Sequence, residues 1–430
     1  MQIMELSSTQ NPQHEPNTSR LNPREELPLF EFPGAPVIDE LGGLRDDKSM
    51  KLPIIVGQDN KGVKIIDLAE SQNLLIAGSR VCYDSIVQSL KTVIYSLLMT
   101  RHPAEVKLIL MDAHGLDFMG YEQLSDHYFA CLPDADKGSI ISSGSDSSKV
   151  MGALQKEIEG RIKLFQKARC RNIEQYNEKY CQQALQPSEG YRFLPYIVLV
   201  ANEYAEFLSL SKPYKQAYLN QFIRVARIGK SAGIHLVFGT TYLLKDLLPR
   251  ELADGFPSVM AYRVNSKSES RMLLMDSGPE ALRDTHSFIL RDNLDTTLLH
   301  SVDIHDDEFD RAIDSIGKQS GYQKSYSTPY YLPDPWSEYE DEGGGGMVDM
   351  KLLDERFEEA ARLIVTSQRG STSDLQRRLG MGYAQVGRVM DQLEAAGIVG
   401  PQNGSKPREV LVKDFDELDH ILAHFLNGEH

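Results

Sequence analysis

Residues 73–85 read NLLIAGSRVCYDS, an apolar run followed by a turn and the start of a helical pattern. A phosphate-binding loop, G-x-x-x-x-G-K-[ST], occurs in this position between a buried strand and a helix. Gly78 and Ser85 stand at the first and last positions of that loop. Tyr83 replaces its second glycine, and Asp84 replaces its lysine. The stretch therefore predicts the strand, turn and helix of a nucleotide-binding domain with altered loop chemistry.

Both replacements weaken the binding of a polyphosphate. The glycines of such a loop let backbone N–H groups approach the phosphate oxygens, and the lysine reaches the outer phosphates. Tyr83 places a bulky side chain where close approach is needed, and Asp84 adds a negative charge. At about 4 Å and an effective dielectric constant near 20, each like-charge pair costs roughly 4 kcal/mol. We expect ATP binding of the usual kind to be lost unless Arg80 or Lys91 lends a cation.

The segments beyond this stretch alternate between strands and helices. Continuous apolar runs predict buried strands at 106–112, 196–201 and 233–239. Amphipathic runs predict helices at 150–168 and 215–230. Because continuous apolar strands separated by helices are typical of a parallel sheet covered on both faces, we predict an α/β fold.

The overall composition limits the classes of function. The 430 residues carry a net charge of −16, so contact with nucleic acid requires a local cluster of cations or a pore lined by several subunits. The cysteines show no metal-ligand spacing and predict reduced thiols. The sequence lacks an apolar run of about 18 residues and a signal-peptide pattern. We therefore expect a cytoplasmic chain with no membrane segment.

Changes in composition divide the chain into four parts. Residues 1–46 are rich in Pro, Asn, Gln and Ser and predict a flexible arm. Residues 47–315 hold the α/β pattern, and residues 316–350 become aromatic, acidic and then glycine-rich, which is typical of a linker. Residues 351–430 predict a small winged helix-turn-helix domain, because helical periodicity is followed by two short strands around a Gly-Ser-Lys-Pro turn.

Motifs spread over nearly everything after residue 50 occur in a characteristic order. They are the loop at 73–85, the sequence R-N-I-E-Q-Y-N at 171–177, the strand and polar end at 194–205, the strand at 232–236, the segment 263–271 and three tail segments at 375–379, 396–401 and 404–411. Together they resemble the FtsK/SpoIIIE family of double-stranded DNA translocases. The resemblance implies a RecA-like P-loop NTPase fold with a parallel sheet, a hexameric ring around DNA and a winged-helix gamma domain.

The resemblance also places a nucleotide site on specific residues. Its nucleotide-contacting positions are Gly78, Ser79, Asp84, Ser85, Thr240 and Thr241. The second motif, which normally ends in Asp-Glu, reads Asn202-Glu203, so the carboxylate that steadies magnesium is lost. Glu203 could still orient water or could be a structural residue at a strand end, and Thr241 replaces a phosphate-sensing glutamine. We predict no cofactor and no metal ligands, with ATP and Mg²⁺ bound only if the altered site functions.

Three further positions match the subunit-contact segment of the family, namely Arg263, Lys267 and Arg271. The resemblance implies that such cations can act on the nucleotide of a neighbouring subunit. Ordinary surface ion pairs are the alternative.

The recognition helix of the tail departs from the family pattern. Relatives begin it with Gly-Tyr-Asn-Arg-Ala-Ala-Arg, whereas residues 382–388 read Gly-Tyr-Ala-Gln-Val-Gly-Arg. The candidate DNA contacts are Arg377, Arg378, Gln385, Arg388, Lys406 and Arg408. We expect contact with phosphates but not the sequence preference of the family. A protein-docking role of the winged helix is the alternative.

Three functions follow from these patterns. The first is an FtsK-like protein, associated with double-stranded DNA, whose own nucleotide site is inactive. It would be a partner or regulatory subunit in a homo- or hetero-hexameric ring with FtsK-like subunits, in chromosome segregation. The second is an active ATP-driven translocase with a rearranged loop, and the third is a protein-interaction adaptor that does not bind DNA. The combined losses at Tyr83, Asp84, Asn202 and Thr241 favour the first, and whether the chain is an enzyme stays open.

Overall fold

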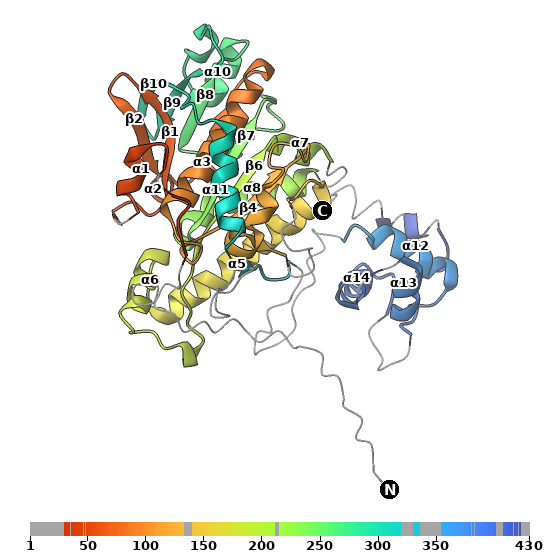
Figure 1. The fold of residues 1–430 in the computed structure, drawn as a ribbon. Helices are drawn as coiled ribbons and strands as arrows, with labels where there is room; N and C mark the ends of the chain where they lie inside the picture. The colour runs from red at the N-terminus through yellow and green to blue at the C-terminus, as the bar shows by residue number, and fades with distance from the viewer. Residues whose placement is uncertain are drawn as a thin grey trace.

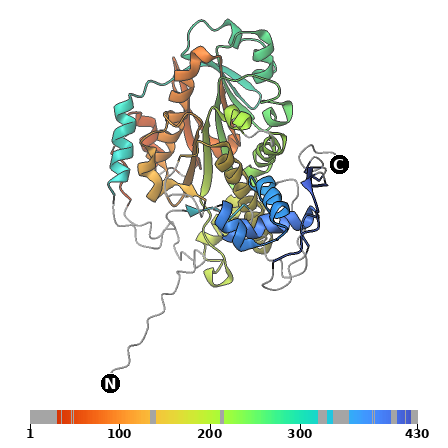
Figure 2. The same ribbon diagram turned by 90° about the vertical axis from the view of Figure 1, so that its right-hand side faces the viewer.

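The structure is a computed structural model, and it is drawn in Figures 1 and 2. It describes residues 30–34, 36–45, 47, 49–132, 140–210, 215–319, 330–335, 354–379, 381, 383–400, 407–415, 417–419 and 421–422. Within these ranges, no helix is both long enough and apolar enough to span a membrane.

The centre of the larger domain is one mixed sheet. Its strands and those of a small second sheet are β1 (Pro53–Asp59), β2 (Gly62–Asp67), β3 (Leu74–Ala77), β4 (Val106–Asp112), β5 (Ala130–Cys131), β6 (Tyr196–Asn202), β7 (Ile234–Thr240), β8 (Ser258–Tyr262), β9 (Ser287–Asp292), β10 (Asp295–His300) and β11 (Tyr330–Tyr331). The strand order is β2-β1-β10-β9-β8-β3-β7-β6-β4. Strands β8, β3, β7, β6 and β4 run parallel, and β9, β10, β1 and β2 continue the sheet in antiparallel fashion.

Helices cover both faces of this sheet, as the two views show. The α-helices are α1 (Asp39–Gly43), α2 (Leu68–Ser71), α3 (Tyr83–Thr100), α4 (Ser125–Tyr128), α5 (Gly144–Ala168), α6 (Ile173–Cys181), α7 (Tyr204–Leu210), α8 (Lys215–Ala232), α9 (Arg250–Ala253), α10 (Lys267–Leu274), α11 (Asp306–Gly317), α12 (Phe357–Ser367), α13 (Thr372–Leu379) and α14 (Tyr383–Ala395). Short 3₁₀ turns are η1 (Arg80–Cys82), η2 (Tyr121–Leu124), η3 (Pro187–Glu189) and η4 (Pro279–Ala281).

Strand β3 shows why a continuous apolar run becomes a central strand. Leu75 and Ala77 belong to the core beneath α5 and α8, whereas Leu74 and Ile76 belong to the core beneath α3. All four residues are buried, because side chains alternate between two covered faces. The predicted α/β sheet with two covered faces is therefore confirmed, although the antiparallel half of the sheet was not predicted.

The predicted element boundaries differ from the observed ones by a few residues. The strand predicted at 106–112 is β4 itself, and β6 extends one residue further, to Asn202. Gly233 has a φ of +74° and lies between α8 and β7, so the third strand begins at Ile234. Helix α5 begins before the predicted residue 150 because the Ser143 hydroxyl caps it by accepting a hydrogen bond from the Asp146 N–H.

Two predicted boundaries of the larger domain need correction. Within the arm predicted at 1–46, Phe30 packs edge-on against Tyr128, and Leu41 of α1 is fully buried. Within the linker predicted at 316–350, Tyr330 of β11 pairs with β5 and is buried. Its hydroxyl donates a hydrogen bond to Glu157 at 2.7 Å. Apolar and aromatic side chains in otherwise polar segments thus extend the domain in both directions.

The tail forms the predicted winged helix-turn-helix domain. Helices α12, α13 and α14 enclose a core of their own, which includes Ile364, Leu375 and Leu393. An antiparallel bridge between Val399 and Val410 joins the two predicted short strands. Most of the turn predicted between them, residues 404–406, lies outside the described residues.

Candidate functional site

Four backbone N–H groups of the loop after β3 are hydrogen-bonded within the protein and do not point at a phosphate site. Gly78 N donates to Thr240 O at 3.3 Å, Ser79 N to Arg263 O at 2.8 Å, and Cys82 N to Ser79 O at 2.8 Å. Tyr83 N donates to Arg80 O, which makes the chain a 3₁₀ turn that leads directly into α3. A phosphate-binding loop needs such N–H groups free to point at the ligand.

Gly78 has a packing role in this loop. A Cβ atom at that position would lie 2.7 Å from the Cβ of Tyr262 on the neighbouring strand β8. The backbone can therefore approach β8 only if residue 78 is glycine. This packing requirement explains why residue 78 is glycine, and no bound nucleotide is needed for the explanation.

The two altered positions Tyr83 and Asn202 meet across the sheet edge. The Asn202 amide Nδ2 lies 3.1 Å from the Tyr83 phenol oxygen and 2.9 Å from Oδ2 of Asp117. The Tyr83 phenol donates to the same Asp117 oxygen at 2.5 Å. Burial, followed by the bond to Asp117, raises the pKa of Tyr83 above its ordinary value. The side chain of Tyr83 thus reaches the strand end that normally holds the magnesium ligand.

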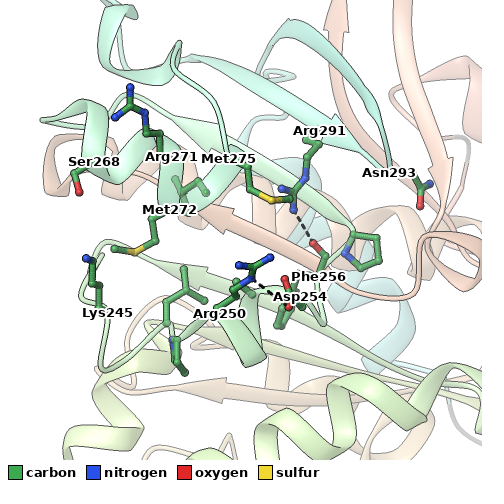
Figure 3. A pocket seen from close by; sticks show the side chains of 15 residues that line it. Lys245, Arg250, Asp254, Phe256, Ser268, Arg271, Met272, Met275, Arg291 and Asn293 are labelled. Atoms are coloured by element: carbon green, nitrogen blue, oxygen red, sulfur yellow. Dashed lines mark hydrogen bonds and ion pairs between the residues drawn. The ribbon is translucent and has the colours of Figure 1, made fainter.

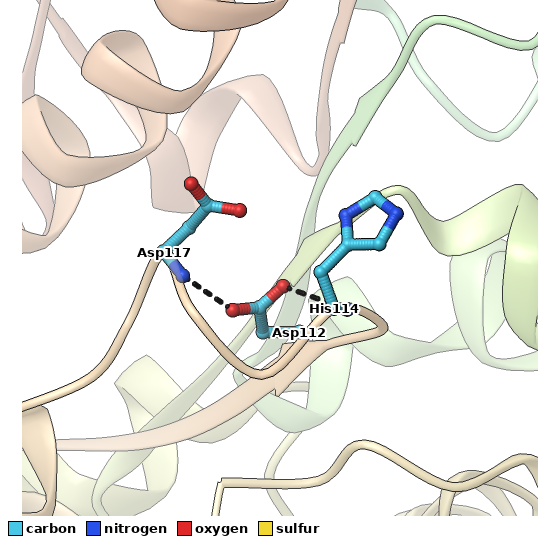
Figure 4. Close-up of side chains that lie close together, drawn as sticks. All are labelled: Asp112, His114 and Asp117. Atoms are coloured by element: carbon cyan, nitrogen blue, oxygen red, sulfur yellow. Dashed lines mark hydrogen bonds between the residues drawn. The ribbon is translucent and has the colours of Figure 1, made fainter.

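The carboxyl end of β4 supplies the other half of this network (Figure 4). Asp112, His114 and Asp117 have potential ligand atoms within 4.8 Å of one another. The Asp112 carboxylate accepts hydrogen bonds from the backbone N–H groups of His114 at 3.2 Å and Asp117 at 2.8 Å. These bonds close the turn after β4, so the Asp112 carboxylate has a structural role in that turn.

Glu203 is enclosed by the two threonines at the end of β7. Its carboxylate accepts from Thr240 Oγ1 at 3.2 Å, from Thr241 Oγ1 at 2.6 Å and from Thr241 N at 3.0 Å. The residue is only 2% exposed and has a left-handed φ of +48°. Burial raises the pKa of Glu203, and the bonds from Thr241 partly oppose that shift. Thr241, expected as a shortened phosphate sensor, instead holds Glu203.

An outer layer of polar contacts crosses the same edge. Tyr242 donates to Glu206 Oε1 at 2.7 Å, and the Arg80 guanidinium donates to the Tyr242 phenol at 3.3 Å. His114 Nε2 lies 3.3 Å from Glu206 Oε2. The cation of Arg80 therefore bonds to a tyrosine of the neighbouring loop.

The remaining loop positions lie on α3. Asp84 is exposed in the first turn, where a carboxylate is favoured by the positive end of the helix dipole. Ser85 is buried, and its carbonyl accepts from the Ser89 hydroxyl at 2.9 Å. Lys91 pairs with Asp306 of α11 at 3.3 Å. The side chain of Lys91 is thus directed to α11, which removes it as a substitute for the missing lysine.

Family-type binding of Mg²⁺–ATP therefore does not fit the residues present. Such binding requires free loop N–H groups, a cation at the lysine position and a carboxylate for the metal. In this chain four of the loop N–H groups are bonded within the protein, Asp84 stands at the lysine position, and Asn202 stands at the position of the metal carboxylate.

The predicted trans-acting cations follow β8 in the sequence. The Arg263 carbonyl accepts from Ser79, and its guanidinium donates to Arg283 O at 3.2 Å. Lys267 and Arg271 are exposed one turn apart on α10. Whether they act on a neighbouring subunit stays a prediction.

The predicted DNA contacts of the tail differ in availability. Arg378 is exposed and makes no hydrogen bond or ion pair to any described residue, whereas Arg377 pairs with Asp374 at 2.7 Å. Arg408 is 8% exposed and donates to Glu394 at 2.6 Å and to Met390 O at 3.0 Å. Gln385 donates to Asp354 at 3.1 Å. Arg408 and Gln385 are therefore engaged within the domain.

Two of these tail positions cannot be placed. The side chain of Arg388 and the whole of Lys406 lie outside the described residues.

Sequence reasoning missed Asp117, His114, Glu206 and Tyr242. The signal was present, because the carboxyl ends of parallel strands meet at one edge of a sheet. The residues just after β4, β6 and β7 could therefore have been predicted as neighbours of Tyr83.

Two family descriptions match this chain. The FtsK/SpoIIIE family matches residues 41–250, and the Ftsk gamma domain matches residues 351–413. The chain is 32% identical over 381 residues to a DNA translocase FtsK of Chlorobaculum tepidum and 30% identical over 371 residues to one of Bacillus anthracis. These alignments cover 88% and 85% of this chain but only 45% and 43% of the relatives, so the chain spans less than half of their length.

Solved structures share the fold. The conjugation coupling protein TcpA of pCW3, determined as a monomer with ATPγS, superposes with a TM-score of 0.52 at 20% identity, over 67% of this chain and 75% of that protein. The cytoplasmic domain of the type VII secretion ATPase EccC of Thermomonospora curvata gives a TM-score of 0.53 at 20% identity, over 67% and 34%. The two family matches, together with the similarity to translocases over most of this chain, show that the chain belongs to the FtsK/SpoIIIE family.

Proposed function

We propose that this chain is a DNA-associated FtsK-like subunit whose own nucleotide site is inactive. The observation that carries the proposal is the bond network in which Tyr83 and Asn202 hold each other and Asp117. Tyr83 stands at a phosphate-loop position and Asn202 at the metal-ligand position. Because the Asn202 amide nitrogen and the Tyr83 phenol bond to each other and to Asp117, neither group needs a polyanion as its partner.

We propose that the chain works beside active subunits of a double-stranded DNA translocase. The relatives are named DNA translocases, and both a motor-like domain and a gamma domain are present in this chain. A ring of FtsK-like subunits, homo- or hetero-hexameric, is the assembly that this proposal requires. A role in chromosome segregation and a cytoplasmic location stay predictions of the same proposal.

The inactive site leaves two ways to act on the ring. The sheet edge of this subunit can keep one conformation whether or not nucleotide is present, while the neighbouring subunits change conformation with ATP. The exposed Lys267 and Arg271 could also contact the nucleotide of a neighbouring active subunit. Both roles are regulatory, and neither requires ATP hydrolysis at the nucleotide site of this chain.

The test is DNA-stimulated release of phosphate by the purified full chain. We expect no release above that of the Glu203→Gln variant, with or without double-stranded DNA. Turnover that disappears in Glu203→Gln would instead support the active translocase with a rearranged loop. Addition of an active FtsK-like protein then tests the partner role, which predicts a changed rate of DNA-dependent turnover.

DNA association needs its own measurement. Filter binding of a DNA duplex at low and moderate salt should show affinity that falls steeply with salt, because phosphate contacts release counterions. Binding that is absent at low salt would favour the adaptor that does not bind DNA.

A further inference from the structure

A cavity of about 700 Å³, drawn in Figure 3, is lined by no residue of the loop of Tyr83. It is bounded by α9, α10, the segment between α9 and β8, and the end of β9. This volume is within the range of small-molecule and side-chain binding pockets, which is roughly 300 to 1,000 Å³. None of the predicted nucleotide-contacting residues lines it.

The walls carry an excess of positive charge. Four cations line the cavity, namely Lys245, Arg250, Arg271 and Arg291, against a single carboxylate, Asp254. This local excess contrasts with the net charge of −16 of the whole chain. An anionic group is therefore the electrostatic complement of this cavity.

Several of these cations keep unused hydrogen-bonding capacity. Arg291 donates to Phe256 O at 3.1 Å, but its Nε is buried with no acceptor among the described residues. Lys245 and Arg271 make no hydrogen bond or ion pair to any described residue. Arg250 has only a long contact to Asp254, at 3.8 Å. Burial lowers the pKa of Arg291, and a bound anion would remove that penalty.

The floor of the cavity is apolar. Leu248 and Phe256 are buried beneath it, and the thioether of Met272 projects over it in Figure 3. Two exposed apolar side chains lie at the cavity or beside it in the sequence: the lining residue Met275 is 72% exposed, and Leu294, which follows the lining residue Asn293, is 97% exposed. A ligand that matches this surface has an apolar group for the floor and extends beyond the cavity.

We propose that the cavity is a docking site for an acidic peptide segment that carries an aromatic side chain. The aromatic ring would enter the apolar floor, and flanking carboxylates would meet Lys245, Arg250 and Arg271. An extended peptide matches the exposed Met275 and Leu294 better than a compact anion does. This proposal does not depend on the state of the nucleotide site. Residues 336–342 of this sequence, Trp-Ser-Glu-Tyr-Glu-Asp-Glu, have the required chemistry and supply a probe.

The test uses the full chain and a fluorescein-labelled peptide of that sequence, titrated by fluorescence anisotropy. We expect saturable binding that weakens by at least about tenfold in the Lys245→Glu/Arg271→Glu variant, because two attractive pairs become repulsive. Lys64→Glu is the matched control, since Lys64 is an exposed cation of β2 that does not line the cavity. A second peptide, in which alanine replaces both aromatic residues, should bind at least about fivefold more weakly. Thermal unfolding checks that each variant is folded.

Four outcomes would overturn the proposal. The first is no saturable binding, and the second is an equal loss in Lys64→Glu, which would show attraction by overall charge alone. The third is equal binding of the alanine peptide. Displacement of the peptide by a short DNA duplex at equal charge would also reject it, because the cavity would then be a phosphate contact.

Discussion

The Asn202 amide nitrogen lies 3.1 Å from the Tyr83 phenol oxygen, although the two residues are 119 positions apart in the sequence. Each residue departs from the family motif at its own position, and the fold brings the two departures into contact. The Tyr83 phenol completes the arrangement by donating to Asp117 at 2.5 Å. The three side chains form a hydrogen-bonded unit at the strand ends where metal and phosphate would bind.

The first prediction concerns the Tyr83 hydroxyl. Tyr83→Phe should lower the free energy of unfolding by about 1 kcal/mol, because Asp117 and Asn202 lose a hydrogen-bond partner. The matched control is Tyr121→Phe, since the Tyr121 hydroxyl is buried with no partner among the described residues. That variant should be neutral or slightly stabilising. Urea unfolding measures both, and equal effects would contradict a structural role for the Tyr83 network.

The second prediction concerns the buried pair of Glu157 and Arg161. Their atoms lie 2.7 Å apart with side-chain exposures of 6% and 0%, and Tyr330 donates to the same carboxylate. Glu157→Gln leaves Arg161 buried without its counter-charge and should cost about 3–5 kcal/mol of stability. Glu159→Gln, which breaks an exposed pair with Arg224, should cost less than about 1 kcal/mol. Similar losses in the two variants would contradict the importance of burial for the pair of Glu157 and Arg161.

The third prediction is a pH dependence from His235. Burial lowers the pKa of His235 to about 4, from an ordinary value of 6.5. Between these values the unfolded chain binds a proton that the folded chain does not, so stability is present above pH 6.5 and is lost as pH falls towards 4. The loss amounts to up to about 3 kcal/mol.

The check is urea unfolding at pH 7.5 and 4.5 in the wild type and in His235→Asn. The variant should lose less stability between the two pH values. Exposed His286→Asn should behave as the wild type does. An unchanged pH dependence in His235→Asn would show that other groups account for the acid lability.

The fourth prediction separates two arginines of the tail. Arg378→Ala should weaken duplex binding and reduce the salt slope by about one, with no loss of stability, because Arg378 is exposed and makes no hydrogen bond or ion pair to any described residue. Arg408→Gln should lower the stability of the winged-helix domain, because it removes the buried contact with Glu394. Filter binding and thermal unfolding distinguish the two effects. Loss of DNA binding in Arg408→Gln without loss of stability would contradict this division.

The sequence alone predicted the main strands and helices, because the patterns that indicate them are local. The apolar runs that became β4, β6 and β7 needed no knowledge of distant residues, and the helical periodicity of the tail predicted its winged helix. The contacts of Tyr83 are different, since they depend on Asp117 and His114 in a loop whose conformation is fixed by the backbone bonds to Asp112. Tyr330 was missed for a related reason, because its segment is polar overall and only its partners reveal that it is buried.

The fifth prediction restores the motif. The triple variant Tyr83→Gly/Asp84→Lys/Asn202→Asp removes the Tyr83 network and supplies the missing cation and carboxylate. We expect binding of Mg²⁺–ATP to strengthen by at least about tenfold, because a repulsive charge becomes attractive. The control is Asp126→Lys, which makes the same charge change as Asp84→Lys alone, at an exposed position of α4. If the control gained as much affinity as the triple variant, the gain would reflect overall charge.

The most direct measurement is calorimetric titration of the unaltered full chain with ATP in the presence and absence of Mg²⁺. The bonded loop, Asp84 and the contact between Tyr83 and Asn202 predict no saturation below about 1 mM in either condition. Magnesium-dependent binding in the micromolar range would contradict the central claim, because it would show that these residues still hold the nucleotide.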